Sequence, residues 1–257
     1  VKAKKIAKWN GSAWSALGSG IESADGWGSV HALAVSSNDL FAGGWFTTAG
    51  GIKANNIARW NGSAWSALGS GIGNEEGWTS THVNALAVSG SDLYAGGCFA
   101  TVGGVKANNI ARWNGSAWSA LGDGLGSLPG LHRVYALAVS GSNLYAGGYF
   151  QAQGGNSPWS IAQWDGSRWW GLYDIAGDIN ALVVSGRDVY VGGDFWGVGG
   201  VSANRIAKWN GSAWSALGSG LNGDACALAL LGEDLYAGGN FTMAGGKVSA
   251  YVAKAVV

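Results

Sequence analysis

The stretch IARWNGSAWSALGSGI, residues 57–72, decides the fold because close copies of it recur along the chain. The copies are IAKWNGSAWSALGSGI at 6–21, IARWNGSAWSALGDGL at 110–125, IAQWDGSRWWGLYDI at 161–175 and IAKWNGSAWSALGSGL at 206–221. Their first tryptophans, Trp9, Trp60, Trp113, Trp164 and Trp209, are separated by 51, 53, 51 and 45 residues. A period of this length is typical of propellers and solenoids, in which each repeat is one supersecondary unit.

A second phrase recurs between these copies, and one form of it is VNALAVSGSDLYAGGCFATVGGVKANN at 83–109. Together the two phrases give four strand candidates in this repeat, VNALAVS, DLYAGGCF, NNIARWN and AWSALG, without helical periodicity between them. Tight turns with glycine join the first strand to the second and the third to the fourth. In an antiparallel meander these two turns lie at one end of the sheet, and the longer loops lie at the other end.

The strand that begins at Ala85 is apolar at nearly every residue, as expected for an inner strand covered on both faces. Five such strands predict an all-β chain that forms one five-bladed β-propeller domain over residues 1–257, with four antiparallel strands in each blade. We expect the hairpin at 6–17 to complete the last blade, so that the N-terminal and C-terminal strands close the ring. The segment SAYVAKAVV at 249–257 resembles a sixth third strand, which either displaces residues 6–9 from this seam or adds to a neighbour.

Composition limits the classes of partner. The chain has 15 Lys and Arg against 15 Asp and Glu, so its net charge is zero and it carries no electrostatic footprint for nucleic acid or an anionic membrane. It also lacks a run of about 20 apolar residues, so we expect no membrane insertion. An extracellular or cell-surface location is favoured, and the sequence leaves the oligomeric state open.

The Gly-Gly pair after an apolar strand, followed by an aromatic residue and then by a Trp beyond a turn, is similar to kelch repeats. LYAGG and ARWNGSAW carry this pattern here. The near-identical units resemble more closely the tryptophan-rich repeats of some bacterial β-propellers, over essentially the whole chain. Blade number and Trp usage also resemble the five-bladed tachylectin-type lectins. These resemblances imply a propeller, a fold that hosts many unrelated functions.

Candidate binding residues are those at which the otherwise copied repeats differ. After the Gly-Gly pair they are Trp45, Tyr149 and Asp194, and before the Ala-Leu of the inner strand they are His31, Asn84, Tyr135 and Asn180. The long loops add Trp27, Trp78, His82, His132 and Arg133. We expect these side chains to form a polar and aromatic rim at the loop end of the blades. Drift in loops without function would explain the same differences.

The chemistry-bearing residues do not form an enzyme signature. The three histidines occur one per repeat without the short spacing of zinc motifs, and no nucleophile elbow or phosphate loop is present. The copper ligands of kelch-like galactose oxidase have no match either, so we expect no enzyme, no metal and no cofactor. The paired tryptophans of each hairpin are expected to pack between blades. The resulting hypothesis is a scaffold that binds a protein partner through its loop face, and the alternative is a multivalent lectin with one site per blade or between blades.

Overall fold

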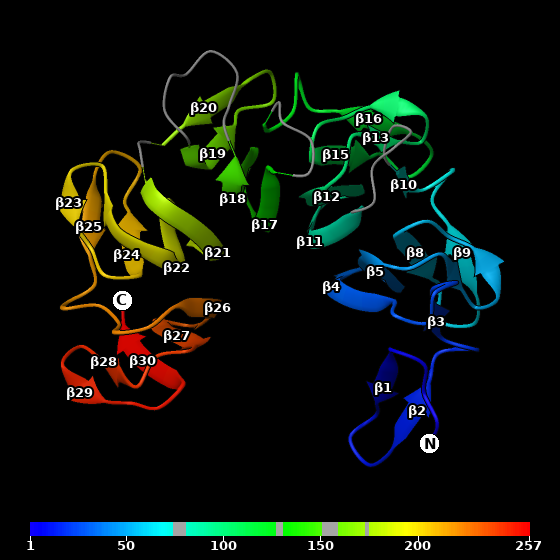
Figure 1. Cartoon of the computed structure of the whole chain (residues 1–257), viewed down its shortest axis with the longest axis horizontal. Coiled ribbons are helices and arrows are strands. Elements are labelled where there is room, and N and C mark those ends of the chain that lie inside the picture. Colours follow the sequence, from blue (N-terminus) through cyan, green and yellow to red (C-terminus); the bar gives the residue numbers. More distant parts are fainter. Residues whose placement is uncertain (74–80, 127–130, 151–158, 173–174) are drawn as a thin grey trace. The chain divides into compact units, whose positions relative to one another are not determined.

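The computed structural model describes residues 1–73, 81–126, 131–150, 159–172 and 175–257. All the secondary-structure elements in these residues are β-strands. The chain divides into two compact units, Val1–Gly130 and Leu131–Val257, each built from short antiparallel sheets (Figure 1). None of these residues belongs to a helix with the length and apolar character needed to cross a membrane.

Unit 1 contains two four-stranded sheets in which the strands follow one another in chain order. They are β4 (Ser29–Ser36), β5 (Asp39–Trp45), β8 (Ile57–Trp60) and β9 (Trp65–Ala67), and β11 (His82–Ser89), β12 (Asp92–Cys98), β15 (Ile110–Trp113) and β16 (Trp118–Ala120). Unit 1 also contains a hairpin of β1 (Ala7–Trp9) and β2 (Trp14–Ala16). One small three-stranded sheet consists of β3 (Ile21–Glu22), β6 (Thr48–Ala49) and β7 (Ile52–Lys53). A second consists of β10 (Ile72–Gly73), β13 (Thr101–Val102) and β14 (Val105–Lys106). The predicted four-stranded meander is therefore present, and the long loops carry additional short strands.

Unit 2 contains three larger antiparallel sheets. The first is β17 (Arg133–Ser140), β18 (Asn143–Phe150), β19 (Trp159–Trp164) and β20 (Trp169–Gly171), and the second is β21 (Ile175–Ser185), β22 (Asp188–Val198), β24 (Ile206–Trp209) and β25 (Trp214–Ala216), with β23 (Val201–Ser202) paired to β22. The third has three strands, β26 (Ala225–Leu231), β27 (Asp234–Gly239) and β30 (Val252–Val256), and β28 (Met243–Ala244) with β29 (Lys247–Val248) forms a separate hairpin.

Strand register places the turns and loops as the meander predicts. In the first sheet Leu40 pairs with Trp60, so the turn before Asp39 and the turn after Trp60 lie at the same end. Trp45 ends β5 at the opposite end, where it pairs with Ser29. Each sheet therefore has a tight-turn end and a loop end.

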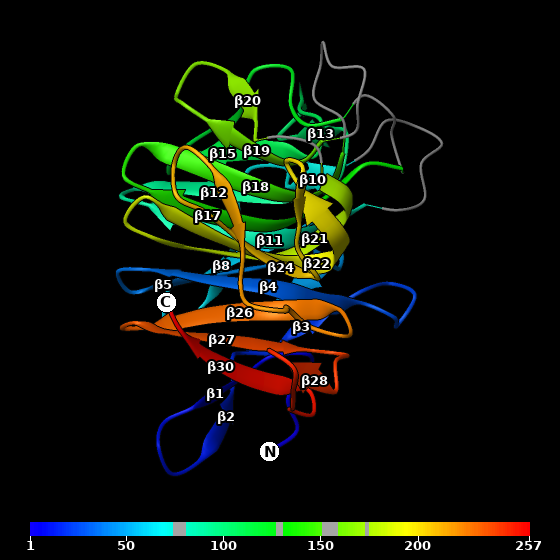
Figure 2. The same cartoon turned by 90° about the vertical axis from the view of Figure 1, so that its left-hand side faces the viewer.

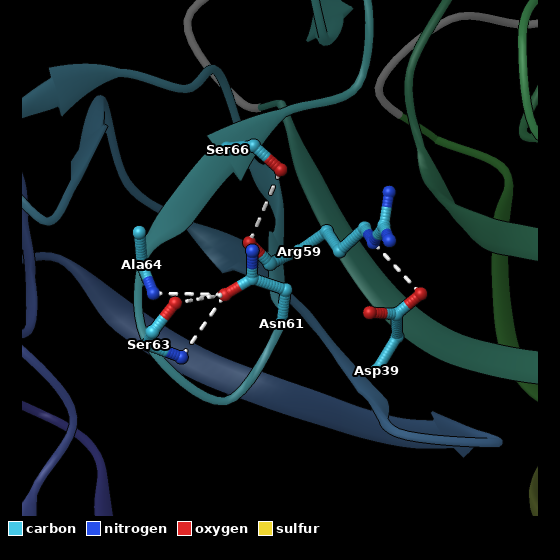
Figure 3. Close-up of polar contacts among 6 residues, drawn as sticks. All are labelled: Asp39, Arg59, Asn61, Ser63, Ala64 and Ser66. Atoms are coloured by element: carbon cyan, nitrogen blue, oxygen red, sulfur yellow. Dashed lines mark hydrogen bonds and ion pairs between the residues drawn. The ribbon is translucent and has the colours of Figure 1, made fainter.

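Asn61 shapes the turn between the third and fourth strands. Its Oδ1 accepts hydrogen bonds from the backbone N–H groups of Ser63 (3.0 Å) and Ala64 (2.9 Å) and from the Ser63 hydroxyl (2.9 Å), as Figure 3 shows. The same bonds form at Asn10, Asn114 and Asn210. The repeated N-G-S motif is therefore a turn held by its own Asn side chain, with Gly62 at a φ of 97°.

Packing between sheets depends on the first glycine of the Gly-Gly pair. A Cβ on Gly43 would collide with Val83 of β11, and one on Gly147 would collide with Ile179 of β21. This glycine lets adjacent inner strands approach, as β4 and β11 do in unit 1. In β11, for which the sequence predicts cover on both faces, every residue is buried or half-buried.

The last sheet is completed by the C-terminal tail. β30 pairs with β27 from Gly238 opposite Val252 to Asp234 opposite Val256, and Figure 2 shows β26, β27 and β30 side by side. Within the described parts of the chain, β1 and β2 pair only with each other. The third-strand place that we expected the hairpin at 6–17 to fill is taken by 249–257, because the tail repeats the apolar-Ala-Lys pattern of a third strand.

Candidate functional site

A β-bulge interrupts each inner strand near the loop end. In β4 the register with β5 shifts between Val30 and Ala32, which leaves His31 as the extra residue. The same shift leaves Asn84, Tyr135, Asn180 and Cys226 as extra residues in β11, β17, β21 and β26. A bulge redirects one side chain and is frequent beside functional sites. The variable positions predicted on the inner strands are thus bulge positions, a feature that apolar periodicity does not reveal.

The second glycine of the Gly-Gly pair makes room for the bulge. A Cβ on Gly44 would collide with the carbonyl oxygen of Ser29, and a Cβ on Gly97 would collide with that of His82. The equivalent glycines of the other sheets meet the same obstacle, at Gly148, Gly193 and Gly239. The repeated glycines therefore fix the backbone conformation at the bulge, and the variable bulge residue determines which side chain stands there.

In unit 1 the loop end brings two imidazoles together. The rings of His31 on β4 and His82 on β11 lie 5.9 Å apart in an edge-to-face arrangement, and His31 is exposed. The Ser29 hydroxyl lies 2.7 Å from Nε2 of His31. Trp45, opposite Ser29 in the ladder, is 41% exposed. Residues far apart in sequence thus form one polar and aromatic surface.

Trp27 stands in the turn that leads into β4, where its side chain is 78% exposed. Its backbone N–H donates to the Asp25 carboxylate at 3.0 Å, and Gly26 takes a φ of 80°. The Ser23 hydroxyl, with the Trp27 N–H, holds the pKa of Asp25 below its usual value. An ionised carboxylate therefore shapes the backbone that presents the exposed indole.

In unit 2 the corresponding loop end carries His132, Arg133 and Tyr149. Tyr149 pairs across the ladder with Arg133, and its ring, 6.1 Å from that of His132, is 46% exposed. His132 is buried, and burial lowers its pKa, so this imidazole is neutral at physiological pH. The arrangement presents a phenol and a guanidinium beside an uncharged ring.

Arg205 organises a second cluster in unit 2. Its Nη2 lies 3.8 Å from Oδ1 of Asp194 and its Nε lies 3.4 Å from Oδ1 of Asp224. The guanidinium carbon is 5.5 Å from the centre of the Trp196 ring, which is 58% exposed. Burial, and then the nearby charge of Asp194, raise the pKa of Asp178 across the ladder. Of these residues only Asp194 was among the predicted candidates.

A sequence signal for this cluster existed. At the position of Arg205 two of the other repeats have Asn56 and Asn109, whose side chains bridge two backbone segments. Asn56 accepts from the Phe46 N–H at 3.2 Å and donates to the Ile72 carbonyl at 2.9 Å. Arginine has no acceptor for the first of these bonds, so it reaches carboxylates instead.

The remaining predicted residues are less informative. Asn84, Tyr135 and Asn180 are half-buried at their bulges. Trp78 lies outside the described residues. Within the described ranges, no group of three or more His, Cys, Asp or Glu side chains is arranged to hold a metal ion. What the loop ends offer is a set of exposed aromatic rings and hydrogen-bonding groups.

Comparisons with known proteins bear on the fold. No protein-family model matches the chain, and no curated protein matches it. The chain is similar to the WD40 beta propeller domain of Doa1, with a TM-score of 0.51 and 12% identity over 82% of this chain and 62% of that one. It is also similar to the extracellular domain of BT4673 from B. thetaiotaomicron, with a TM-score of 0.50 and 15% identity over 82% of this chain and 25% of that one. The chain thus spans less than two thirds of either neighbour, and the likeness, with the repeated antiparallel sheets, shows an all-β propeller fold.

Proposed function

We propose that this chain is a non-enzymatic recognition scaffold that binds a protein partner through the loop ends of its blades. It acts without a metal or cofactor, outside the cell or at its surface, and neither nucleic acid nor a membrane is its partner. The observation that carries this proposal is a contrast between the two ends of the sheets. The hairpins at the tight-turn ends repeat almost unchanged, whereas the residues at the loop ends vary from sheet to sheet. The turn bonds of Asn61 recur at Asn114 and Asn210. The five bulge positions, in contrast, carry four different residue types: His31, Asn84, Tyr135, Asn180 and Cys226.

We also propose that the five sheets are the blades of one propeller. Each of the strands β4, β11, β17, β21 and β26 begins a sheet of its own. Within unit 1, β4 packs against β11, and within unit 2, β17 packs against β21 and β21 against β26. The propeller neighbours support this architecture.

The surface best suited to a partner comprises Trp27, His31 and Trp45 of unit 1, called here the Trp27 surface. The turn that carries Trp27 lies against the end of β5, because a Cβ on Gly28 would be 3.0 Å from the Trp45 carbonyl oxygen. Trp27 and Trp45 are 78% and 41% exposed. Large aromatic side chains are enriched among the residues that dominate binding energy at protein interfaces.

The lectin alternative depends on tryptophans that recur in every blade. Trp65, Trp118 and Trp214 are each 7% exposed, and each donates its indole N–H to a backbone carbonyl at 2.9 Å. Such rings have no open face on which a sugar could stack. The burial of the repeated tryptophans therefore favours a packing role for them. The differences between the loop ends favour binding of one asymmetric partner.

An affinity capture from the source organism with immobilised protein tests this proposal. We expect Trp27→Ala and Trp45→Ala to weaken the captured complex by roughly 30-fold, the equivalent of about 2 kcal/mol for an interface anchor. Their melting temperatures should stay close to that of the parent. Trp170→Ala is the matched control, because this indole is 44% exposed at a tight-turn end. Calorimetric titration that finds several equal sugar sites, insensitive to Trp27→Ala, would instead establish the lectin.

A further inference from the structure

The last sheet of unit 2 contains a cavity of about 250 Å³. Its apolar lining includes Leu217, Leu221, Leu235, Ala237, Ala253 and Ala255. An engineered cavity of about 150 Å³ binds benzene, so this volume suffices for a bicyclic aromatic ring. We call this cavity the tryptophan socket.

At the equivalent place in other sheets a tryptophan fills the space. Trp118 donates its indole N–H to the Leu68 carbonyl at 2.9 Å. Its ring and that of Trp113 cover Gly69, and Trp118 also covers Gly103. Trp65 makes the same bond to Leu17 and covers Gly18 and Gly50.

Beside the last sheet the equivalent glycines are not covered by a tryptophan. A Cβ placed on Gly218 or on Gly245 would have no heavy atom within 4 Å. The Leu217 carbonyl accepts the Gly220 N–H at 3.1 Å, as Leu17 accepts that of Gly20 at 3.1 Å. Among the described residues no indole N–H reaches the Leu217 carbonyl, whose second lone pair is the one used in the other sheets.

The cause lies in the sequence of β30. Lys254 pairs with Asp234 at 2.9 Å, as Lys208 pairs with Asp188 at 2.6 Å, so the tail imitates a third strand. However, Ala255 stands opposite Leu235, where the preceding sheet has Trp209 opposite Val189. No fourth strand follows β30 in this sheet. Both tryptophans of a blade are therefore missing.

The chain carries the missing piece at its other end. Residues 6–20, which contain β1 and β2, are identical to residues 206–220, whose Trp214 fills the preceding socket. The Trp9 and Trp14 rings are 5.5 Å apart at 47°, as are those of Trp209 and Trp214. Yet Trp9 and Trp14 are 48% and 57% exposed. This N-terminal hairpin is already folded for a socket.

The base of the N-terminal hairpin is fixed in unit 1. Ile6 and Leu17 belong to a buried cluster there, and the Ile21 N–H donates to the Lys4 carbonyl at 3.0 Å. The chain therefore presents a built hairpin while its own socket is held by β30. A molecule that carries both a hairpin and a complementary socket joins copies head to tail, as a ring or an open chain.

We propose that the tryptophan socket receives the N-terminal hairpin of a second copy of this chain, which exchanges with β30. Trp14 then donates to the Leu217 carbonyl, Trp9 takes the place of Ala255, and Lys8 takes the place of Lys254 beside Asp234. The identity of 6–20 with 206–220 supplies the register. This contact is separate from the Trp27 surface, so either proposal can fail while the other stands.

Sedimentation of the full chain over a wide concentration range, with two complementary variants, tests the exchange. Trp9→Ala/Trp14→Ala removes the indoles of the hairpin, and Ala255→Trp fills the socket from β30. We expect the parent chain to self-associate, each variant alone to associate at least about tenfold more weakly, and their equimolar mixture to form a one-to-one dimer. A mixture that stays monomeric while both variants keep the parent dichroism spectrum would overturn the proposal.

Exposed charges provide a second measurement that does not depend on core changes. Lys254→Glu opposes Asp234 and weakens β30, so it should strengthen association, whereas Lys8→Glu should weaken it. Equal effects of the two reversals would contradict exchange with β30. A parent chain that is monomeric at all concentrations, with Trp9 and Trp14 protected from a soluble quencher, would show that the socket is filled within one copy and would also refute the inference.

Discussion

Trp118→Ala tests whether the repeated tryptophans hold the blades together. Trp118 is 7% exposed, and its ring lies 5.4 Å from that of Trp113. A side chain of this size buries about 150 to 250 Å², which at about 25 cal/mol per Å² corresponds to about 4 to 6 kcal/mol. The Leu68 carbonyl keeps its bond from the Gly71 N–H at 3.1 Å, so the lost indole bond adds at most about 1 kcal/mol. Since neighbouring side chains relax into part of the cavity, we expect a loss of about 3 to 5 kcal/mol.

The chain offers a matched control in Trp14→Ala. Residues 10–17 and 114–121 have the same sequence, NGSAWSAL, yet Trp14 is 57% exposed and Trp118 is buried. Urea unfolding in dilute protein, where copies do not associate, should show a loss of less than about 1 kcal/mol for Trp14→Ala. Trp118→Phe should lie between the two, because it keeps part of the packing and loses the donor.

Equal losses for Trp118→Ala and Trp14→Ala would refute this reasoning, since local sequence would then decide the cost and burial would not. A loss below about 1 kcal/mol for Trp118→Ala would do the same, because it would mean that the ring is not packed between sheets. In that case the lectin alternative, which needs accessible rings, would regain support.

Three further predictions concern the tight-turn end. Asn61→Ala removes three hydrogen bonds to one oxygen and should cost about 1 to 2 kcal/mol in urea unfolding. The Trp170 indole and the neighbouring turn groups hold the pKa of Asp165 well below its usual range, so its stabilising effect is present above about pH 4 and is lost as the pH falls through the folded-state pKa. Asp165→Asn, which restores the residue found in the other turns, should remove that loss from melting curves below about pH 4. Arg59→Gln breaks a 2.8 Å ion pair with Asp39 whose arginine is 47% exposed, so its cost should stay below about 1 kcal/mol and shrink in high salt.

The five repeats are visible in the amino-acid order, and with them the four-stranded meander and its two kinds of end. These features follow from local rules. Apolar strands alternate with turns in which Asn61 and its equivalents hold the backbone through their own side chains, and such bonds span only a few residues. The variable rim positions could also be found, because copied repeats make every deviation stand out.

Tertiary structure decided which of those deviations meet. His31 and His82 are 51 residues apart, and only the packing of β4 against β11 brings their rings to 5.9 Å. Periodicity is also insensitive to a single inserted residue, so the bulges at His31 and its equivalents emerge only from the ladder register. The competition at the last sheet is of the same kind. Residues 6–9 and 252–255 both carry a third-strand pattern, and only the strand register shows that β30 lies beside β27 while Trp9 and Trp14 remain exposed.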